Sequence, residues 1–291
     1  MKTLLAGWFS FDQMGATAGD IMACDIARGW LESAGHTVDI AVAPPFTGGV
    51  NWQTVDPSQY TQVAFVCGPF GDGWPITEFL ARFSTSRLIG LNLSMIEPLE
   101  VWNPFGLLLE RDSSRASRPE IVFISDQPKV PVVGVVLVHA QMEYKSGRLH
   151  QVADDAIRRL IDSRPMATVV IDTRLDVNAM GLRNAAEVES LIARMDVILT
   201  TRLHGTVLAL KNGVPAIAID PIVGGAKIRR QADNIGWPVC FDAGSLTDKA
   251  LAEAFAFCLT QEARALARDC AARARGNVAK IRDEFISAVR V

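Results

Sequence analysis

Arg202 and His204 stand two residues apart, and Gly205 and Thr206 follow them directly. The guanidinium of an arginine can pair with two oxygens of a phosphate or carboxylate at once. An imidazole can hold a proton near neutral pH and pass it to a reacting atom. Glycine allows a ligand to come close to the backbone, and threonine adds a hydroxyl group. We therefore predict a site for a small anion with a proton donor beside it.

The elements around these residues would place them at the end of a strand. The run 196–200 (DVILT) is typical of a buried strand, and a helical pattern begins close to Gly205. The start of a helix offers unpaired N–H groups and the positive end of the helix dipole, and both favour an anion. A structural interpretation stays open, because a histidine before a helix often packs or caps, and Thr206 could cap the helix.

Short apolar runs alternate with helical patterns along most of the chain. This alternation is typical of βα units around a parallel sheet, and it predicts the α/β fold class. The expected strands are residues 3–9, 37–43, 62–68, 87–94, 120–125, 132–140, 167–172, 196–200, 215–220 and 238–241. The expected helices are residues 18–35, 75–84, part of 99–112, 148–163, 184–194, the segment after Gly205, 225–235, and nearly all of 245–291.

A polar, proline-bearing segment at 125–131 (SDQPKVP) interrupts this alternation. A chain of 291 residues has room for two domains. We expect residues 1–127 and 128–291 to form two Rossmann-like βα domains that face each other across a cleft. Ligands of such sheets bind beyond the carboxyl ends of the strands. The C-terminal helix is a candidate to pack back on the first domain.

The composition is that of a soluble globular protein, with 49% apolar residues and a net charge of −3. This charge argues against general attraction to nucleic acids or membrane surfaces, although peripheral contact with a membrane stays open. No apolar run is long enough to span a bilayer, and Asp12 interrupts the apolar start of the chain. Five cysteines without a CxxC pair predict buried free thiols in a reducing compartment. We expect a cytoplasmic protein.

The segments TTRLHGTVLALKNGVPAIAID and GGAKIRRQADNIGWP resemble the signature of the polysaccharide pyruvyl transferase family. That signature joins an Arg-Leu-His-Gly segment, a helix that ends in Gly-x-Pro, a strand, and a later Lys and Gly. The matching positions here are Arg202, Leu203, His204, Gly205, Gly213, Pro215, Lys227 and Gly236. The family has a two-domain fold like that of GT-B glycosyltransferases, which agrees with the expected pair of βα domains.

The first half of the chain resembles the family more weakly. Gly19 and Asp20 are similar to its Gly-Asp before a helix, and Arg111 and Asp112 to its Arg-Asp-x-x-Ser element, with Ser114 or Ser117 as the serine. The family's triple glycine is replaced by Gly-Pro-Phe-Gly at 68–71. These departures lie in the domain expected to hold the acceptor, so the identity of the acceptor is left open.

The resemblance implies transfer of the pyruvyl unit of phosphoenolpyruvate onto a sugar, as a ketal. It implies Arg111, Arg202 and Lys227 as donor-binding cations, with Gly205 and Thr206 beside them. His204 would be the general acid. Asp20 would orient or deprotonate an acceptor hydroxyl, or it would be the N-cap of its helix. The expected partners are phosphoenolpyruvate and a saccharide or glycan-lipid acceptor, with no cofactor and no metal. The oligomeric state is left open.

Two other functions fit the same pattern. A GT-B-type glycosyltransferase or sugar-nucleotide epimerase also places the start of a helix under a diphosphate, but it would not need the Arg-Leu-His trio. A non-catalytic relative could bind a glycan or a small anion instead. His139, at the end of the strand expected at 132–140, is a weaker candidate for a functional histidine.

Overall fold

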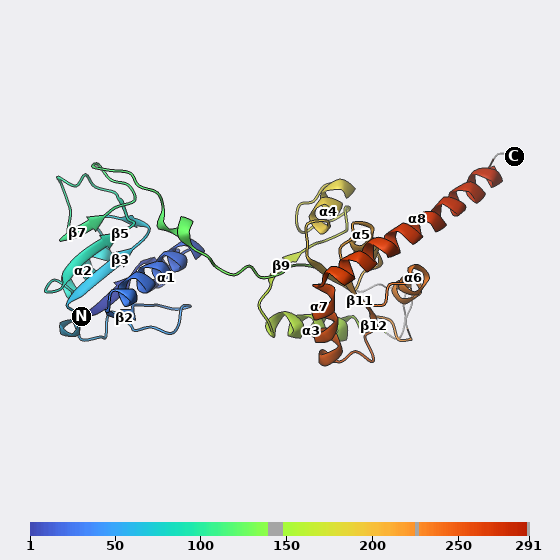
Figure 1. Ribbon diagram of the computed structural model, residues 1–291, viewed down its shortest axis with the longest axis horizontal. Helices are drawn as coiled ribbons and strands as arrows, with labels where there is room; N and C mark the ends of the chain where they lie inside the picture. The colour runs from blue at the N-terminus through green and yellow to red at the C-terminus, as the bar shows by residue number, and fades with distance from the viewer. Residues whose placement is uncertain (139–147, 225–226, 290–291) are drawn as a thin grey trace. The chain divides into compact units, whose positions relative to one another are not determined.

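The computed structural model describes residues 1–138, 148–224 and 227–289 (Figure 1). The chain divides into two compact units, Met1–Gln127 and Pro128–Val291. Each unit contains a five-stranded sheet in which neighbouring strands run parallel. The predicted α/β class, with parallel sheets in two domains, is therefore confirmed. That the two domains face each other across a cleft stays a prediction.

The sheet of the first unit has the strand order β2-β1-β3-β5-β7. Helix α1 (Ala18–Ser33) contacts β1, β2 and β3, and α2 (Ile76–Arg82) follows β4 in the chain. The strands are β1 (Lys2–Ala6), β2 (Thr37–Ile40), β3 (Gln62–Val66), β5 (Arg87–Leu91) and β7 (Leu107–Leu109), and β4 (Pro69–Phe70) pairs with β6 (Ser94–Met95). Short 3-10 helices are η1 (Trp8–Ser10), η2 (Pro57–Gln59) and η3 (Ile121–Ile124).

The core of this unit combines buried strands with a group of aromatic rings. Strand β3 is buried along its whole length. Phe65 from β3 packs against Phe11 and Phe79, with ring centroids 6.2 and 5.9 Å apart. The ring of Trp52 also packs against Phe79, with ring centroids 5.4 Å apart. Aromatic side chains bury large areas and add favourable edge contacts, so this group gives the loops above the sheet a rigid base.

Two predictions for this half are wrong. The expected helix within 99–112 is a turn followed by β7, because Asn103 accepts the N–H of Phe105 around Pro104 and the chain then pairs with β5. The expected strand at 120–125 is η3, because the side chain of Glu120 accepts the N–H of Val122 and caps a short helix.

The sheet of the second unit has the strand order β12-β11-β10-β8-β9. Its apolar strands form the core with helices on both sides in the chain order βα. The strands are β8 (Val132–Val136), β9 (Ala167–Val170), β10 (Val197–Thr200), β11 (Ala216–Asp220) and β12 (Cys240–Asp242). The helices are α3 (His150–Asp162), α4 (Ala185–Ile192), α5 (Leu203–Lys211), α6 (Lys227–Ile235), α7 (Asp248–Cys258) and α8 (Gln261–Val289).

The helical tail is two helices rather than the single one expected. The break falls at Leu259 and Thr260, where the Thr260 hydroxyl accepts the N–H of Ala263 and so begins α8. Helix α8 contacts α5, α6 and α7 of its own unit. Beyond these contacts it exposes apolar side chains, among them Val278, Ile281 and Phe285. That the helix packs back on the first unit stays a prediction.

Each sheet reverses its strand order at one point. In the first unit the chain moves from β1 to β2 on one side and to β3 on the other. In the second unit it moves from β8 to β9 on one side and to β10 on the other. The loops diverge at such a point and leave a crevice at the carboxyl ends of the two central strands, where open α/β sheets bind their ligands.

Candidate functional site

Arg202 lies near the carboxyl end of β10, beside β8, where the strand order of the second unit reverses. It is the second residue after β10 and the N-cap residue of α5, in an extended backbone conformation. The Thr200 hydroxyl fixes this turn, because it accepts the N–H of Arg202 at 3.0 Å and donates to the Val136 carbonyl of β8 at 2.9 Å. The sequence therefore places Arg202 where the strand order reverses and a helix begins.

The guanidinium of Arg202 is partly buried and incompletely paired. Its Nη1 donates to the Thr173 hydroxyl at 3.0 Å, whereas its Nε is buried without a hydrogen-bond partner. Among the described residues, Arg202 makes no salt bridge. Burial lowers the pKa of Arg202, and the nearby carboxylate of Asp172 opposes that shift. A buried polar group without a partner is costly, so this arginine is suited to take an anionic ligand.

His204 is exposed at the second position of α5. Arg202 occupies the N-cap position, and nothing in the described parts of the chain bonds to the imidazole. The packing and capping roles left open for His204 therefore do not apply. Its exposure leaves the ring accessible from solvent. Its role as an acid stays a prediction.

Gly205 and Thr206 both have structural functions at the start of α5. A Cβ atom at Gly205 would lie 2.2 Å from Oγ1 of Thr200, so the glycine lets α5 pack closely on β10. Thr206 is fully buried, and its hydroxyl lies 3.4 Å from the Arg202 carbonyl, to which it donates. The capping role considered for Thr206 is wrong, because Arg202 is the N-cap of α5. Contact of Gly205 and Thr206 with a ligand stays a prediction.

Lys227 is exposed as the first residue of α6. It lines a pocket of about 530 Å³ with Leu203, the residue before His204, and with Arg230 of α6 and Asn277 of α8. The starts of α5 and α6 therefore contribute to one hollow. The role of Lys227 in binding a ligand stays a prediction. His139 lies outside the described residues.

The first unit has a pocket of its own at the β1/β3 crevice. It has a volume of about 530 Å³ and holds two predicted site residues, Asp20 and Arg111. Trp8 follows β1, and Cys67 and Gly68 follow β3. Gly68 has φ +85°, and a Cβ there would lie 2.2 Å from the Trp8 ring. The indole thus packs directly on the backbone that replaces the triple glycine of the family.

Asp20 is buried, with 7% of its surface exposed, and it is the third residue of α1. Its Oδ2 accepts two hydrogen bonds from Thr17, one from the backbone N–H and one from the hydroxyl, each 2.7 Å long. The N-cap residue is therefore Thr17 and not Asp20. Asp20 fixes the start of the helix from its third position and still lines the pocket.

Arg111 is paired with carboxylates, unlike Arg202. It donates to Glu120 at 2.8 Å, to Asp112 at 3.1 Å, and to the Ser94 hydroxyl. Burial opposes its charge, but the bonds to Glu120 and Asp112 raise the pKa of Arg111. Asn92 in turn donates to Glu120. The charge of Arg111 is thus already balanced, so it is a weaker anion anchor than Arg202.

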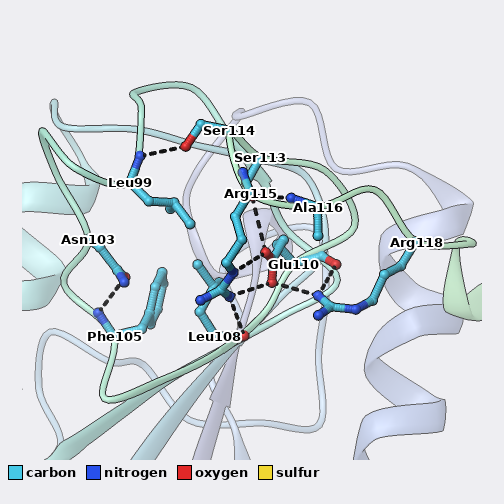
Figure 2. Close-up of polar contacts among 10 residues, drawn as sticks. All are labelled: Leu99, Asn103, Phe105, Leu108, Glu110, Ser113, Ser114, Arg115, Ala116 and Arg118. Atoms are coloured by element: carbon cyan, nitrogen blue, oxygen red, sulfur yellow. Dashed lines mark hydrogen bonds and ion pairs between the residues drawn. The ribbon is translucent and has the colours of Figure 1, made fainter.

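A buried carboxylate positions the loop that carries Arg111. Figure 2 shows Glu110 surrounded by donors from the residues that follow it. Its fully buried side chain accepts from Arg115 at 2.9 Å, from Arg118 at 2.6 Å and from the Ser113 hydroxyl at 3.1 Å. Hydrogen bonds from Arg115 hold the pKa of Glu110 far below its usual range. Ser114 instead accepts the N–H of Leu99, which joins this loop to the preceding turn (Figure 2).

The cysteines do not supply a nucleophile. All five are free and buried, as the sequence predicted. Burial raises the pKa of Cys67 to about 11, and the negative charges of Glu120 and Asp20 add to that shift. Because only the thiolate is reactive, Cys67 lines the pocket as a neutral thiol at physiological pH.

Two residues that bond to the predicted site arginines were not among the sequence predictions: Thr173, which bonds to Arg202, and Glu120, which bonds to Arg111. Thr173 follows the strand expected at 167–172, so its place at the carboxyl edge could have been inferred. Glu120 gave no such signal, because its contact with Arg111 depends on the turn at η3.

Within the described residues, no group of three or more His, Cys, Asp or Glu side chains could hold a metal ion. No described helix is both long and apolar enough to cross a membrane.

Comparison with protein families gives a match in the second unit. The family model described as polysaccharide pyruvyl transferase matches residues 138–221, which include β9, β10, α5 and β11. The resemblance drawn from the sequence is confirmed over this range, which contains Arg202 and His204. The match supports a transferase that modifies polysaccharides. A search of curated proteins found no match to this chain.

Several solved structures are similar over most of the chain. A spinosyn forosaminyltransferase is 13% identical, with 92% of this chain and 93% of that chain covered and a TM-score of 0.33. A spinosyn rhamnosyltransferase is 11% identical, with 93% and 95% covered and a TM-score of 0.34. The UDP-GlcNAc 2-epimerase of Methanocaldococcus jannaschii is 10% identical, with 96% and 99% covered and a TM-score of 0.32. At these scores the likeness carries no argument about substrate or chemistry.

Proposed function

We propose that the protein transfers the pyruvyl unit of phosphoenolpyruvate to a saccharide or glycan-lipid acceptor, as a ketal across two hydroxyl groups. The observation that carries the proposal is the partly buried guanidinium of Arg202, which lies inside the family match and has no salt bridge among the described residues. Phosphoenolpyruvate carries a phosphate and a carboxylate, and an arginine fork fits either group. A cytoplasmic location and the lack of a cofactor belong to the same proposal.

The donor would lie at the start of α5. Arg202 would bind one of its anionic groups in place of the missing partner of Nε. The first N–H groups of α5 have no acceptor within the helix, and they point toward the same edge. Lys227, at the start of α6, would add a second cation. Arg111 has a smaller role in this proposal, since Glu120 and Asp112 already balance its charge.

His204 would supply the proton that starts the reaction. Proton transfer from the imidazolium to the methylene carbon turns it into a methyl group and leaves positive charge at the carbon that bears the phosphate. The first acceptor hydroxyl attacks that carbon and releases its proton to the neutral imidazole. Phosphate then leaves, the second hydroxyl attacks, and its proton also goes to a base. The balance is phosphoenolpyruvate plus a diol giving a cyclic ketal plus inorganic phosphate.

The acceptor would use the Asp20 pocket of the first unit. The side-chain oxygens of Asp20 can accept a hydrogen bond from a sugar hydroxyl in addition to those from Thr17. Trp8 and Arg111 lie in the same pocket and offer an aromatic surface and a hydrogen-bond donor. These groups are of the kind that recognise a sugar, although they do not select one sugar over another.

The test is the release of inorganic phosphate. The protein is incubated with phosphoenolpyruvate and a panel of glycan and glycan-lipid acceptors, and each product is examined by mass spectrometry. We expect phosphate release that requires an acceptor, together with a product heavier by pyruvate less water. Thermal shift assays run in parallel should give stabilisation by phosphoenolpyruvate and little by UDP-sugars. Stabilisation by UDP-sugars alone would overturn the proposal and favour a sugar-nucleotide enzyme.

A further inference from the structure

A second pocket of the first unit lies beside the Asp20 pocket and has no function in the reaction above. Its volume is about 220 Å³, and we name it the Trp74 pocket. Loops that follow β1, β2 and β4 supply its walls. The residues that matter for its chemistry are Asp12, Asn51, Trp52, Gln53, Trp74 and Glu78. Its size suits a single ring, since pockets for drug-sized ligands take roughly 300–1,000 Å³.

The pocket combines a fixed aromatic wall with an exposed aromatic ring. Trp52 is buried, and its ring packs against Phe11 and Phe79 at 5.6 and 5.4 Å. Trp74 is 74% exposed, although the next two residues, Pro75 and Ile76, are buried. This exposed indole is thus attached to a well-packed segment of the chain. It is a suitable surface for stacking against the apolar face of a ligand.

Polar groups without protein partners surround these rings. Asp12, Gln53 and Glu78 are exposed, and their side chains make no hydrogen bond or ion pair with other described residues. Asn51 accepts the N–H of Gln53 at 2.9 Å through its Oδ1, which leaves its NH2 group as a donor. No described lining residue is Lys or Arg. The pocket therefore offers acceptors, amide groups and an indole, and it would repel an anion.

We infer that the Trp74 pocket binds a neutral pyranose ring. One face of such a ring consists of C–H groups, which stack on an indole, and its hydroxyls donate to carboxylates and exchange hydrogen bonds with amides. The two carboxylates, Asp12 and Glu78, would take hydroxyl donors, and Gln53 and Asn51 would serve the remaining hydroxyls. This combination disfavours an anion, which would meet two carboxylates, and an apolar ring, which would leave all four polar groups unpaired.

The position of the pocket indicates which sugar this is. Trp8 and Met14 line the Asp20 pocket, whereas Ser10, Phe11 and Asp12, between them in the chain, line the Trp74 pocket. The ring of Trp8, from the Asp20 pocket, and the ring of Phe11, from the Trp74 pocket, lie 5.9 Å apart. Given the proposed function, the Trp74 pocket holds the sugar next to the one that receives the pyruvyl unit. The enzyme would then select a glycan rather than a free monosaccharide.

Saturation-transfer NMR on the full chain, without phosphoenolpyruvate, tests this inference. The probes are methyl glycosides of glucose, galactose and mannose, N-acetylglucosamine, and glucosamine as a charged amine. We expect at least one neutral probe to bind. Trp74→Ala should weaken its affinity about tenfold, and Asp12→Asn or Glu78→Gln about fivefold. The matched control is Trp30→Ala, which removes another exposed tryptophan from α1 and should leave binding unchanged.

The outcomes separate this inference from the proposed function. Binding that survives in folded Trp74→Ala, binding of glucosamine alone, or binding of no probe at all would each overturn the inference. None of these results bears on phosphate release from phosphoenolpyruvate. Conversely, the protein could bind sugar through Trp74 and yet fail to turn over phosphoenolpyruvate. That result would support the sugar site and would overturn only its assignment to an acceptor glycan.

Discussion

Replacement of Glu110 by glutamine should destabilise the first unit, because this buried carboxylate organises the loop that carries Arg111. Gln has the same shape, but its amide NH2 would face guanidinium donors and its carbonyl is a weaker acceptor. At least one charge-assisted hydrogen bond from Arg115 or Arg118 is lost. Loss of such a bond costs about 1.5–3 kcal/mol.

The solvent exposure of Arg115 and Arg118 limits the loss of stability caused by Glu110→Gln. The side chains of Arg115 and Arg118 are 53% and 45% exposed, so water can solvate them once Glu110 is neutral. The larger penalty of about 3–5 kcal/mol applies when a buried charge is left alone, and no such charge remains here. We therefore expect a free energy of unfolding lower by about 2–3 kcal/mol at pH 7.

The contribution of Glu110 to the free energy of unfolding should depend on pH. The native pKa of Glu110 lies far below the value of roughly 4.3 for a free glutamate. Its contribution is thus fully present above pH 5 and is lost as the pH falls toward the native pKa. The stability difference between wild type and Glu110→Gln should therefore shrink as the pH falls from about 5 to 3.

Tryptophan fluorescence during urea unfolding measures this difference in the first unit. Five of the six tryptophans lie there, at positions 8, 30, 52, 74 and 102. Glu32→Gln, at an exposed position of α1, is the matched control and should unfold like the wild type. The reasoning is refuted if Glu110→Gln is as stable as the wild type at pH 7, or if the difference is constant from pH 7 to pH 3.

Three further predictions concern α5. Gly205→Ala should lower the free energy of unfolding by about 1–3 kcal/mol, measured by calorimetry, because the new Cβ would clash with Thr200. This loss should exceed the helix-propensity gain of about 1 kcal/mol for alanine over glycine. A variant more stable than the wild type would show that the packing at Gly205 is not tight. Thr206→Val should cost about 1 kcal/mol by loss of the bond to Arg202, and a measured change in phosphoenolpyruvate affinity would instead indicate ligand contact. His204→Ala should lower turnover roughly 10²–10⁴-fold in the phosphate assay with donor affinity retained, and near-normal turnover would exclude the imidazole as the acid.

The sequence predicts the sheets well because their strands are apolar runs. The runs that became β3, β8, β10 and β11 are buried along nearly their whole length, so composition alone marks them. The predictions of a helix within 99–112 and of a strand at 120–125 are wrong for a common reason. Their apolar residues suggest regular elements, but Asn103 and Glu120 bond to nearby backbone N–H groups and favour turns instead.

The site could be predicted only at the level of its motif. The spacing of Arg202 and His204 indicated an anion site, and the order of strand and helix indicated the edge of the sheet. Sequence could not show that Glu120 and Asp112 balance Arg111 while Arg202 lacks a carboxylate partner in the described chain, because these contacts depend on turns and loops. Nor could it separate Gly205 as a packing residue from Gly205 as a ligand contact, since both need a missing Cβ.

The affinity for phosphoenolpyruvate, measured by isothermal titration calorimetry on wild type and Arg202→Ala, tests the central claim most directly. Loss of a charge-assisted contact of about 1.5–3 kcal/mol predicts a dissociation constant raised roughly 10–150-fold. Arg174→Ala is the matched control, because it removes a neighbouring positive charge that Asp176 already pairs, and its affinity should stay close to that of the wild type. An unchanged dissociation constant in a folded Arg202→Ala variant, or an equal loss in Arg174→Ala, would contradict the assignment of Arg202 as the donor anchor.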